Sequence, residues 1–247
     1  MSRYFEIHRA DWDAIYHAPA GSLRARVNRR FRRAVWGRMA LALAEYPAVD
    51  GGSVLDVGCG TGELGLRLAA RGATRVVGVD SAQAMVEVAA AHTRVRGLEE
   101  RCRFVHADFM TCDLGGETFD FAAALGVLDY VADAPAFLSR LWGHTRGRMV
   151  VSLPHAVPPR AWARRLWHGL HGSHIHYYQA ADVSRLAAGL VPAIVRVHAI
   201  HGSDRTDVVV WERPASPAAA VATATHALPS RRWSEPELDR LLAAVRG

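Results

Sequence analysis

Short apolar segments alternate with amphipathic segments along the middle of this 247-residue chain. The apolar segments predict strands at 53–57, 75–79, 102–106, 119–125 and 147–153. Helices are predicted between them at 62–71, 82–96 and 134–143, and a further helix near 179–188 precedes two β-rich runs, PAIVRVHAI and TDVVVWE. Such alternation indicates a mostly parallel sheet, and the short HGSDR connection predicts an antiparallel final hairpin. We expect an α/β fold with a seven-stranded, mostly parallel sheet, helices on both faces and an antiparallel last strand.

Segments outside this sheet predict a lid at one end and an appended helix at the other. The expected division is an N-terminal helical lid at 1–46, a main domain at 47–213, a linker at 214–233 and a C-terminal helix at 234–247. The linker is rich in proline, alanine, serine and threonine. One face of the last helix is apolar, which predicts that it docks on the domain or on a second subunit. A monomer and a homodimer both remain open.

The positive charge of the chain consists of arginine alone. All 30 Lys+Arg positions are arginine, which gives a net charge of +6 and points to a GC-rich coding genome. The densest group, RARVNRRFRRAVWGR at 24–38, has an apolar stripe and predicts a solvated amphipathic helix. An anion-binding or RNA-binding face is the alternative interpretation.

Two further features concern location and cysteine chemistry. The chain lacks an apolar run of membrane-spanning length, and SRYFEIHRADWD lacks the apolar middle of a signal peptide, so we expect a cytoplasmic protein without a membrane partner. Cys59, Cys102 and Cys112 lack CxxC spacing. This pattern argues against a disulfide framework and against a zinc knuckle.

A glycine loop follows the first predicted strand, in VLDVGCGTGELG. Gly58, Gly60 and Gly62 allow the backbone to approach a ligand closely. Nicotinamide and flavin enzymes use a similar loop to bind a pyrophosphate. Here Asp56 would repel a pyrophosphate but suits a cationic ligand, and the spacing is G-x-G-x-G. Asp80 ends the next strand, where an acidic side chain can accept hydrogen bonds from ribose hydroxyls.

These residues resemble the class I S-adenosylmethionine (SAM)-dependent methyltransferases, whose first motif reads much like LDVGCGTG. The resemblance spans roughly residues 40 to 212 and implies a Rossmann-like fold with SAM as cofactor and S-adenosylhomocysteine (SAH) as product. It implies methyl transfer to an O or N atom of a small molecule, in bacterial secondary metabolism. An RNA or protein methyltransferase, or a SAM-binding protein without methyl transfer, is the alternative. The implied cofactor residues are Tyr16, Asp56, Gly58, Cys59, Gly60, Gly62, Asp80, Ser81, Met85, Asp108, Phe109 and Leu125.

The N-terminal segment YFEIHRADWDAIY is similar to the opening of magnesium-protoporphyrin methyltransferases. This similarity implies that Tyr4 and Tyr16 contact the substrate as part of an aromatic lid. The chain departs from that family at Asp129, where the family more often has histidine. The departure argues against a porphyrin substrate.

The substrate side is predicted in two segments. In ALGVLDYVAD, Asp129 and Tyr130 are expected to face the acceptor, although Asp129 or Asp133 can equally cap the following helix. The long 155–178 connection predicts a substrate lid. The candidate catalytic residues are His176 first, His155 second and Asp129, and the candidate substrate residues of the lid are Tyr177 and Tyr178.

A metal-assisted mechanism is not expected at this site. The fifth strand ends in VVSLPHAVPP without Asp or Asn, and the histidines of HGLHGSHIHYYQ are irregularly spaced around glycines. The sequence therefore predicts no catalytic metal, and turnover is expected to survive EDTA.

Overall fold

The computed structural model contains one eight-stranded sheet with the strand order β3-β2-β1-β4-β5-β7-β6-β8. It describes residues 2–17, 33–46, 51–157, 174–190, 194–200, 205–214 and 230–233, together with 162, 166, 192, 237, 239–241 and 243. In the first helix, the side chains of 2–5, 7–9 and 11 are not described.

The strands and helices from residue 53 to residue 212 fall close to the predicted ranges, whereas most of the predicted helix at 24–38 and most of that at 234–247 lie outside the described residues. The strands are β1 (Ser53–Val57), β2 (Arg75–Asp80), β3 (Cys102–His106), β4 (Phe119–Ala124), β5 (Thr145–Pro154), β6 (Ile194–Ile200), β7 (Thr206–Glu212) and β8 (Ser230–Arg232). The helices are α1 (Ser2–His17), α3 (Arg33–Glu45), α4 (Glu63–Ala70), α5 (Gln83–Val95), α6 (Ala134–Gly143) and α8 (Ala180–Ala188).

The sheet confirms the predicted topology and adds one strand to it. β1 to β5 pair in parallel, and β7 lies antiparallel between β5 and β6. β8 pairs in parallel with β6, with Ser230 opposite Val197. Three residues are too few to give a periodic signal in the sequence, so β8 was included in the predicted linker 214–233. The last residues of that range therefore belong to the sheet.

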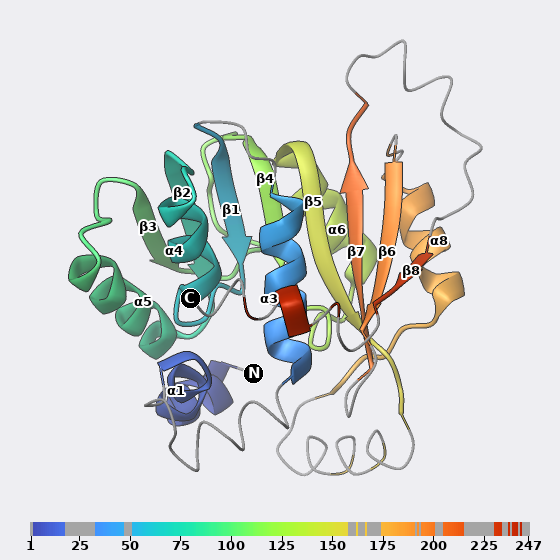
Figure 1. Cartoon of the computed structure of the whole chain (residues 1–247), viewed down its shortest axis with the longest axis horizontal. Coiled ribbons are helices and arrows are strands. Elements are labelled where there is room, and N and C mark those ends of the chain that lie inside the picture. The colour runs from blue at the N-terminus through green and yellow to red at the C-terminus, as the bar shows by residue number, and fades with distance from the viewer. Residues whose placement is uncertain are drawn as a thin grey trace.

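Helices cover both faces of the sheet (Figure 1), and an apolar core cluster lies on each face. Buried side chains of α3 and α4 pack on one face, and buried side chains of α6 and α8 pack on the other. The parallel strands are buried on both faces, which explains their continuous apolar sequences. Among the described residues, no helix combines the length and apolar character needed to cross a membrane.

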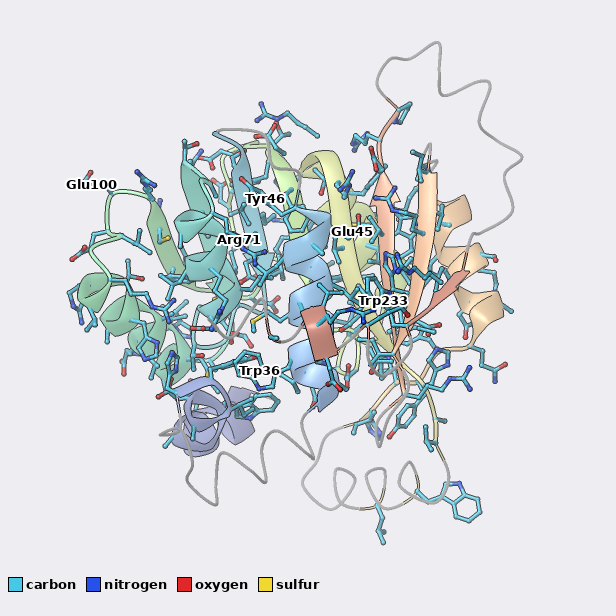
Figure 2. The ribbon with its side chains drawn as sticks, viewed as in Figure 1. Trp36, Glu45, Tyr46, Arg71, Glu100 and Trp233 are labelled. Carbon is cyan, nitrogen blue, oxygen red and sulfur yellow. The ribbon has the colours of Figure 1, made fainter. Side chains whose placement is uncertain are left out.

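The C-terminal segment packs on the α3 face. Trp233 and Leu241 contact the core there, and the Trp233 indole N–H donates to His198 Nδ1 at 3.1 Å. Figure 2 shows Trp233 in front of the β6 and β7 end of the sheet, with Glu45 nearby on α3. Burial alone would raise the pKa of Glu45, but hydrogen bonds from His198 and Arg196 lower it to about 2. This ion-paired group fixes α3 to the antiparallel end of the sheet.

α1 lies away from the sheet faces, at the edge toward which the β1 arrow points (Figure 1). The carboxyl ends of the parallel strands meet at this edge, which is where ligands bind in open α/β sheets. Contacts with α5 and α4 fix α1 there. Ala84 N–H, in the first turn of α5, donates to Glu6 Oε2 at 3.0 Å. His17 Nε2 lies 3.3 Å from Glu63 Oε2, at the start of α4.

Candidate functional site

A cavity of about 320 Å³ opens at the carboxyl ends of β1, β2 and β4. Every cofactor residue implied by the resemblance lines this cavity, with the exception of Gly62. Residues from α1 and α3 close it on one side, and the segment after β4 closes it on the other. The fold therefore brings together positions that are separated by up to about half of the chain.

The three loop glycines have different roles in the structure. All three have positive φ, at +70° for Gly58, +53° for Gly60 and +79° for Gly62. A Cβ at Gly60 would meet no heavy atom within 4 Å, so its backbone is open toward a ligand. A Cβ at Gly62 would lie 2.8 Å from Phe104 Cζ, so this glycine is required for packing under the loop. This explains why Gly62 does not line the cavity.

Asp80 holds the glycine loop and the start of α5 together. Its Oδ2 accepts the Gly60 N–H at 2.8 Å, and its Oδ1 accepts the Ala82 N–H at 2.9 Å. Burial raises the pKa of Asp80, although these two hydrogen bonds oppose the shift. Each carboxylate oxygen keeps a second lone pair, so the side chain can still accept from two hydroxyl groups of a ligand.

Asp56 is a buried carboxyl group with one oxygen available to a ligand. It is 3% exposed, and its Oδ2 has no hydrogen-bond partner among the residues that the structure describes. Burial, and then the negative charge of Asp80, raise its pKa to about 7. A buried carboxylate is costly unless a positive group compensates it. Asp56 therefore suits a ligand that brings a cation to the cavity.

Arg38 is a cavity residue that the sequence analysis missed. It comes from α3, and it belongs to a helix segment that is otherwise apolar, AVWGRMALALA. Gly126 has φ +76°, which favours glycine, and a Cβ there would lie 2.6 Å from Arg38 Nη2, so the guanidinium packs directly against this glycine. An isolated charge inside an apolar helix was the available signal, and it was overlooked because the arginine-rich segment 24–38 was interpreted as solvated.

The cavity has an aromatic wall near the end of β3. Phe109 is buried and packs edge-on against Phe137, with ring centroids 5.2 Å apart. Asp108 is exposed, and its Oδ1 accepts the Met110 N–H at 2.9 Å. Ser81 and Met85 line the same end of the cavity. An apolar ring with a carboxylate at its edge suits a planar heterocycle such as adenine.

The remaining walls are mostly apolar and aromatic. Trp12 and Tyr16 reach the cavity from α1, and the Tyr16 ring packs edge-on against Trp36 of α3 with centroids 5.1 Å apart. After β4, Val127, Tyr130 and Val131 line the cavity. Val35, Met39 and Phe137 complete the apolar lining. This surface can bind the apolar body of a second ligand.

The predicted catalytic residues lie outside the cavity lining. His176 donates its backbone N–H to the Asp129 carbonyl at 2.8 Å, which places it beside the segment that carries Tyr130. Asp129 is buried and does not cap α6, because Asp133 accepts the Ala136 N–H there. His155 Nε2 lies 2.7 Å from Asp207 Oδ2 on β7.

The predicted substrate tyrosines lie in four different kinds of position. Tyr16 and Tyr130 line the cavity. Tyr178 is buried in the core, and its hydroxyl donates to the Leu128 carbonyl at 3.1 Å, so it supports the segment after β4. Tyr177 is half-buried and does not line the cavity. The side chain of Tyr4, like His168 and His171, lies outside the described residues.

Comparisons with known proteins agree with this geometry. Residues 54–147 match the family model of the methyltransferase domain. The chain is 40% identical over 86 residues to the ubiquinone biosynthesis O-methyltransferase of Dinoroseobacter shibae, an alignment that covers 35% of this chain and 34% of that protein. The chain thus spans about a third of the length of the curated relatives it matches.

Two solved structures share the fold over most of the chain. Magnesium protoporphyrin IX methyltransferase from Synechocystis PCC 6803 with bound SAH superposes with a TM-score of 0.69, at 21% identity, over 86% of this chain and 97% of that chain. The 4+2 cyclase SpnF superposes with a TM-score of 0.63, at 17% identity, over 87% of this chain and 96% of that one. The chain therefore has the class I SAM-dependent methyltransferase fold.

Proposed function

We propose that this chain binds SAM in the cavity described above and transfers its methyl group to an O or N atom of a small molecule. The observation that carries the proposal is the convergence of Asp56, Asp80, Arg38 and Phe109 on one cavity beside an open glycine loop. Each of these groups suits a different part of SAM.

The charged parts of the cofactor suit the uncompensated charges of the cavity. The ammonium group of the methionine moiety suits Asp56, whose Oδ2 has no hydrogen-bond partner within the described part of the chain. The carboxylate of the same moiety suits the Arg38 guanidinium. Asp80 suits the ribose hydroxyls, and Phe109 suits the adenine ring.

The residues of the chain would contribute position and environment to the reaction. When bound, the sulfonium supplies an electrophilic methyl group for an in-line displacement. Trp12 and Tyr16 would exclude water from the cavity, and Tyr130 would orient the acceptor. A base is needed only where the acceptor must lose a proton.

The lining favours a small acceptor with an apolar or aromatic body. Val35, Met39, Val127, Val131 and Phe137 offer apolar surface next to the aromatic side chains of α1. A nucleic-acid acceptor is less well supported, because several arginines of the described surface are ion-paired within the chain, as Arg146 is with Asp120. The ubiquinone-pathway relative, whose name records an O-methyltransferase, supports an oxygen acceptor.

A protein that binds SAM without methyl transfer is the second candidate, because a 4+2 cyclase shares the fold. Incubation with SAM and panels of phenols, catechols, amines and carboxylic acids separates the two candidates. Release of SAH that depends on one acceptor class supports the methyltransferase. Tight SAH binding without turnover on any panel member supports the second candidate, and methylation of RNA or protein alone would contradict the small-molecule assignment.

The Arg38 assignment predicts a loss of cofactor affinity. In Arg38→Met the apolar length of the side chain remains, but the charge-assisted hydrogen bond to the cofactor carboxylate is lost. We expect SAH binding to weaken by about tenfold, measured by calorimetry. Arg71→Met is the matched control, because the Arg71 guanidinium donates to the Leu43 carbonyl outside the cavity. Equal affinities in the two variants would remove Arg38 from the cofactor site.

His176 is our first candidate for proton removal, and His155 is the second. Tyr130 is the cavity residue that lies next to His176. We expect His176→Ala to lower turnover by roughly 10²- to 10⁴-fold with SAH affinity unchanged. In Tyr16→Ala we expect both lower turnover and weaker cofactor binding, because Tyr16 lines the cavity. His174→Ala is the control for His176→Ala, because the His174 side chain is exposed and lies two residues before His176 in the chain. Full activity of His176→Ala, with activity lost in Tyr130→Phe, would assign the role to Tyr130.

A further inference from the structure

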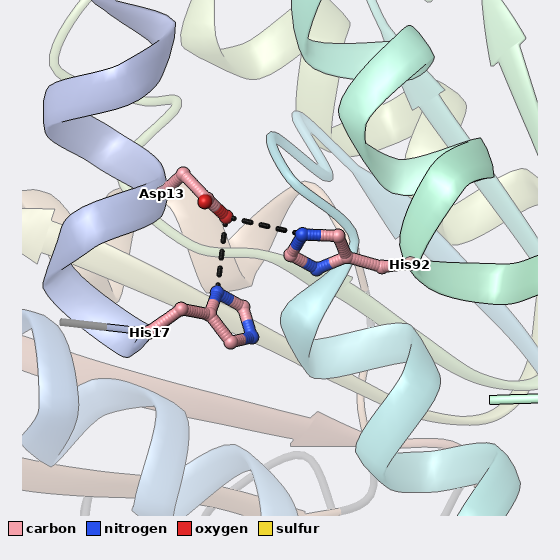
Figure 3. Close-up of side chains that lie close together, drawn as sticks. All are labelled: Asp13, His17 and His92. Carbon is pink, nitrogen blue, oxygen red and sulfur yellow. Dashed lines mark hydrogen bonds and ion pairs between the residues drawn. The ribbon is translucent and has the colours of Figure 1, made fainter. Parts of the chain in front are cut away.

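We propose that Asp13, His17 and His92 form a zinc-binding site that fixes helix α1 to helix α5. Figure 3 shows the three side chains converging between the two helices, with the Asp13 carboxylate facing both imidazole rings. Asp13 Oδ1 lies 3.0 Å from His17 Nδ1 and 3.3 Å from His92 Nε2. One ligand atom from each residue lies within 4.8 Å of the other two.

The donor atoms and their spacing suit a tetrahedral zinc ion. Two imidazole nitrogens and one carboxylate oxygen are ordinary zinc ligands, with a water as the usual fourth. Ligand atoms that lie about 2.0–2.1 Å from a tetrahedral zinc are about 3.3 Å from one another. The two separations from Asp13 are close to this value, and the two histidine ligand atoms lie within 4.8 Å of each other.

Glu63 provides the outer contact that a zinc-bound histidine requires. When His17 binds a metal through Nδ1, its Nε2 carries a proton, and this atom lies 3.3 Å from Glu63 Oε2. A carboxylate in this position orients the ring and makes it a better ligand.

Neighbouring charges affect the zinc affinity that we expect of the site. Arg96 Nη2 lies 2.8 Å from Glu63 Oε2 and 3.3 Å from His17 Nε2, and Arg67 pairs with Glu63 Oε1 at 2.6 Å. These guanidinium groups repel a divalent cation, so we expect them to weaken its binding. Asp13, His17 and His92 are each 20–31% exposed, which gives an ion and a water ligand access from solvent.

The proposed zinc site lies next to the residues of α1 that line the cavity, so it would help to close the cavity. Asp13 follows Trp12 along α1, and His17 follows Tyr16, and both aromatic residues line the cavity. A zinc ion that joins α1 to α5 would therefore hold these two side chains over the ligand. The ion would lie outside the cavity lining, so it would act on the helix and not on the acceptor. The effect on ligand binding rests on the proposed function, whereas the metal site does not.

A zinc titration of the full chain tests the site. The protein is stripped with EDTA, desalted and titrated with Zn²⁺ against a chelating dye, and Co²⁺ is used as a visible probe of tetrahedral geometry. We expect a site of micromolar affinity that weakens at least tenfold in His92→Ala and in Asp13→Asn. His106→Ala is the control, because this ring is exposed outside the group. Affinity unchanged in His92→Ala, or lowered equally in His106→Ala, would overturn the proposal.

His92→Ala is the decisive variant, because α5 packs through its buried residues Ala84, Met85, Ala89 and Thr93, and we expect it to stay folded without the partly exposed His92 ring. SAH affinity, measured with and without Zn²⁺, then reports the effect on the cavity. We expect zinc to tighten SAH binding roughly fivefold or more in the unchanged protein and not in His92→Ala. If SAH binds under neither condition, the proposed function fails while the titration still decides the metal site. At saturating SAM, EDTA is expected to leave turnover intact.

Discussion

Replacement of Asp80 by alanine is expected to weaken SAH binding by about 1.5–3 kcal/mol, the loss of charge-assisted hydrogen bonds to the ribose. This corresponds to roughly 10- to 150-fold in the dissociation constant, measured by calorimetry. The same substitution releases Gly60 N–H and Ala82 N–H, both of which donate to this carboxylate. The glycine loop therefore loses its support together with the ribose contact.

Two further variants separate these effects. Asp80→Asn keeps one acceptor oxygen for the backbone, so we expect a smaller loss than in the alanine variant. Asp113→Ala also removes a carboxylate that accepts a backbone N–H, from Gly115 at 2.7 Å, but in an exposed turn outside the cavity. We expect it to bind SAH normally. An unchanged dissociation constant in Asp80→Ala would mean that the ribose lies elsewhere.

Replacement of Asp56 by asparagine is expected to stabilise the ligand-free protein at alkaline pH and to weaken SAH binding. The folded-state pKa of Asp56 is raised from 3.8 to about 7. Folding therefore favours the protonated form, and the free energy of unfolding falls as pH rises from about 4 to about 7. Over the full titration, a shift of this size corresponds to a loss on the order of 4 kcal/mol. Asparagine is neutral at every pH and avoids this loss, but it cannot compensate the cofactor ammonium.

Denaturant unfolding at pH 5 and pH 8 measures this effect. We expect the stability advantage of Asp56→Asn over the unchanged protein to grow by roughly 2–3 kcal/mol between the two pH values. Asp120→Asn is a control of opposite sign. Hydrogen bonds from Ser53 and the charge of Arg146 outweigh burial and lower the pKa of Asp120, so its removal costs stability at pH 8. If the Asp56→Asn advantage is equal at pH 5 and pH 8, Asp56 is ionised in the fold.

The sequence by itself was sufficient for the features that depend on neighbouring residues. The β1 strand, the glycine loop and the start of α4 form one continuous segment, so their pattern and spacing predicted both the strand edge and the loop. Asp56 and Asp80 were found because each occupies a fixed place at the carboxyl end of a parallel strand. Backbone geometry imposes such positions wherever this topology occurs, so local sequence predicts them.

The tertiary structure decided the features that join distant segments. Arg38 lines the cavity next to Gly126, which lies far along the chain, and the guanidinium packs directly against this glycine. Asp13, His17 and His92 meet because α1 crosses to α5, although the first two are 75 or more positions from the third. β8 forms because its three residues pair with β6 at the edge of the sheet, although their sequence alone does not predict a strand. No local pattern encodes these contacts, because they depend on how helices and strands pack against one another.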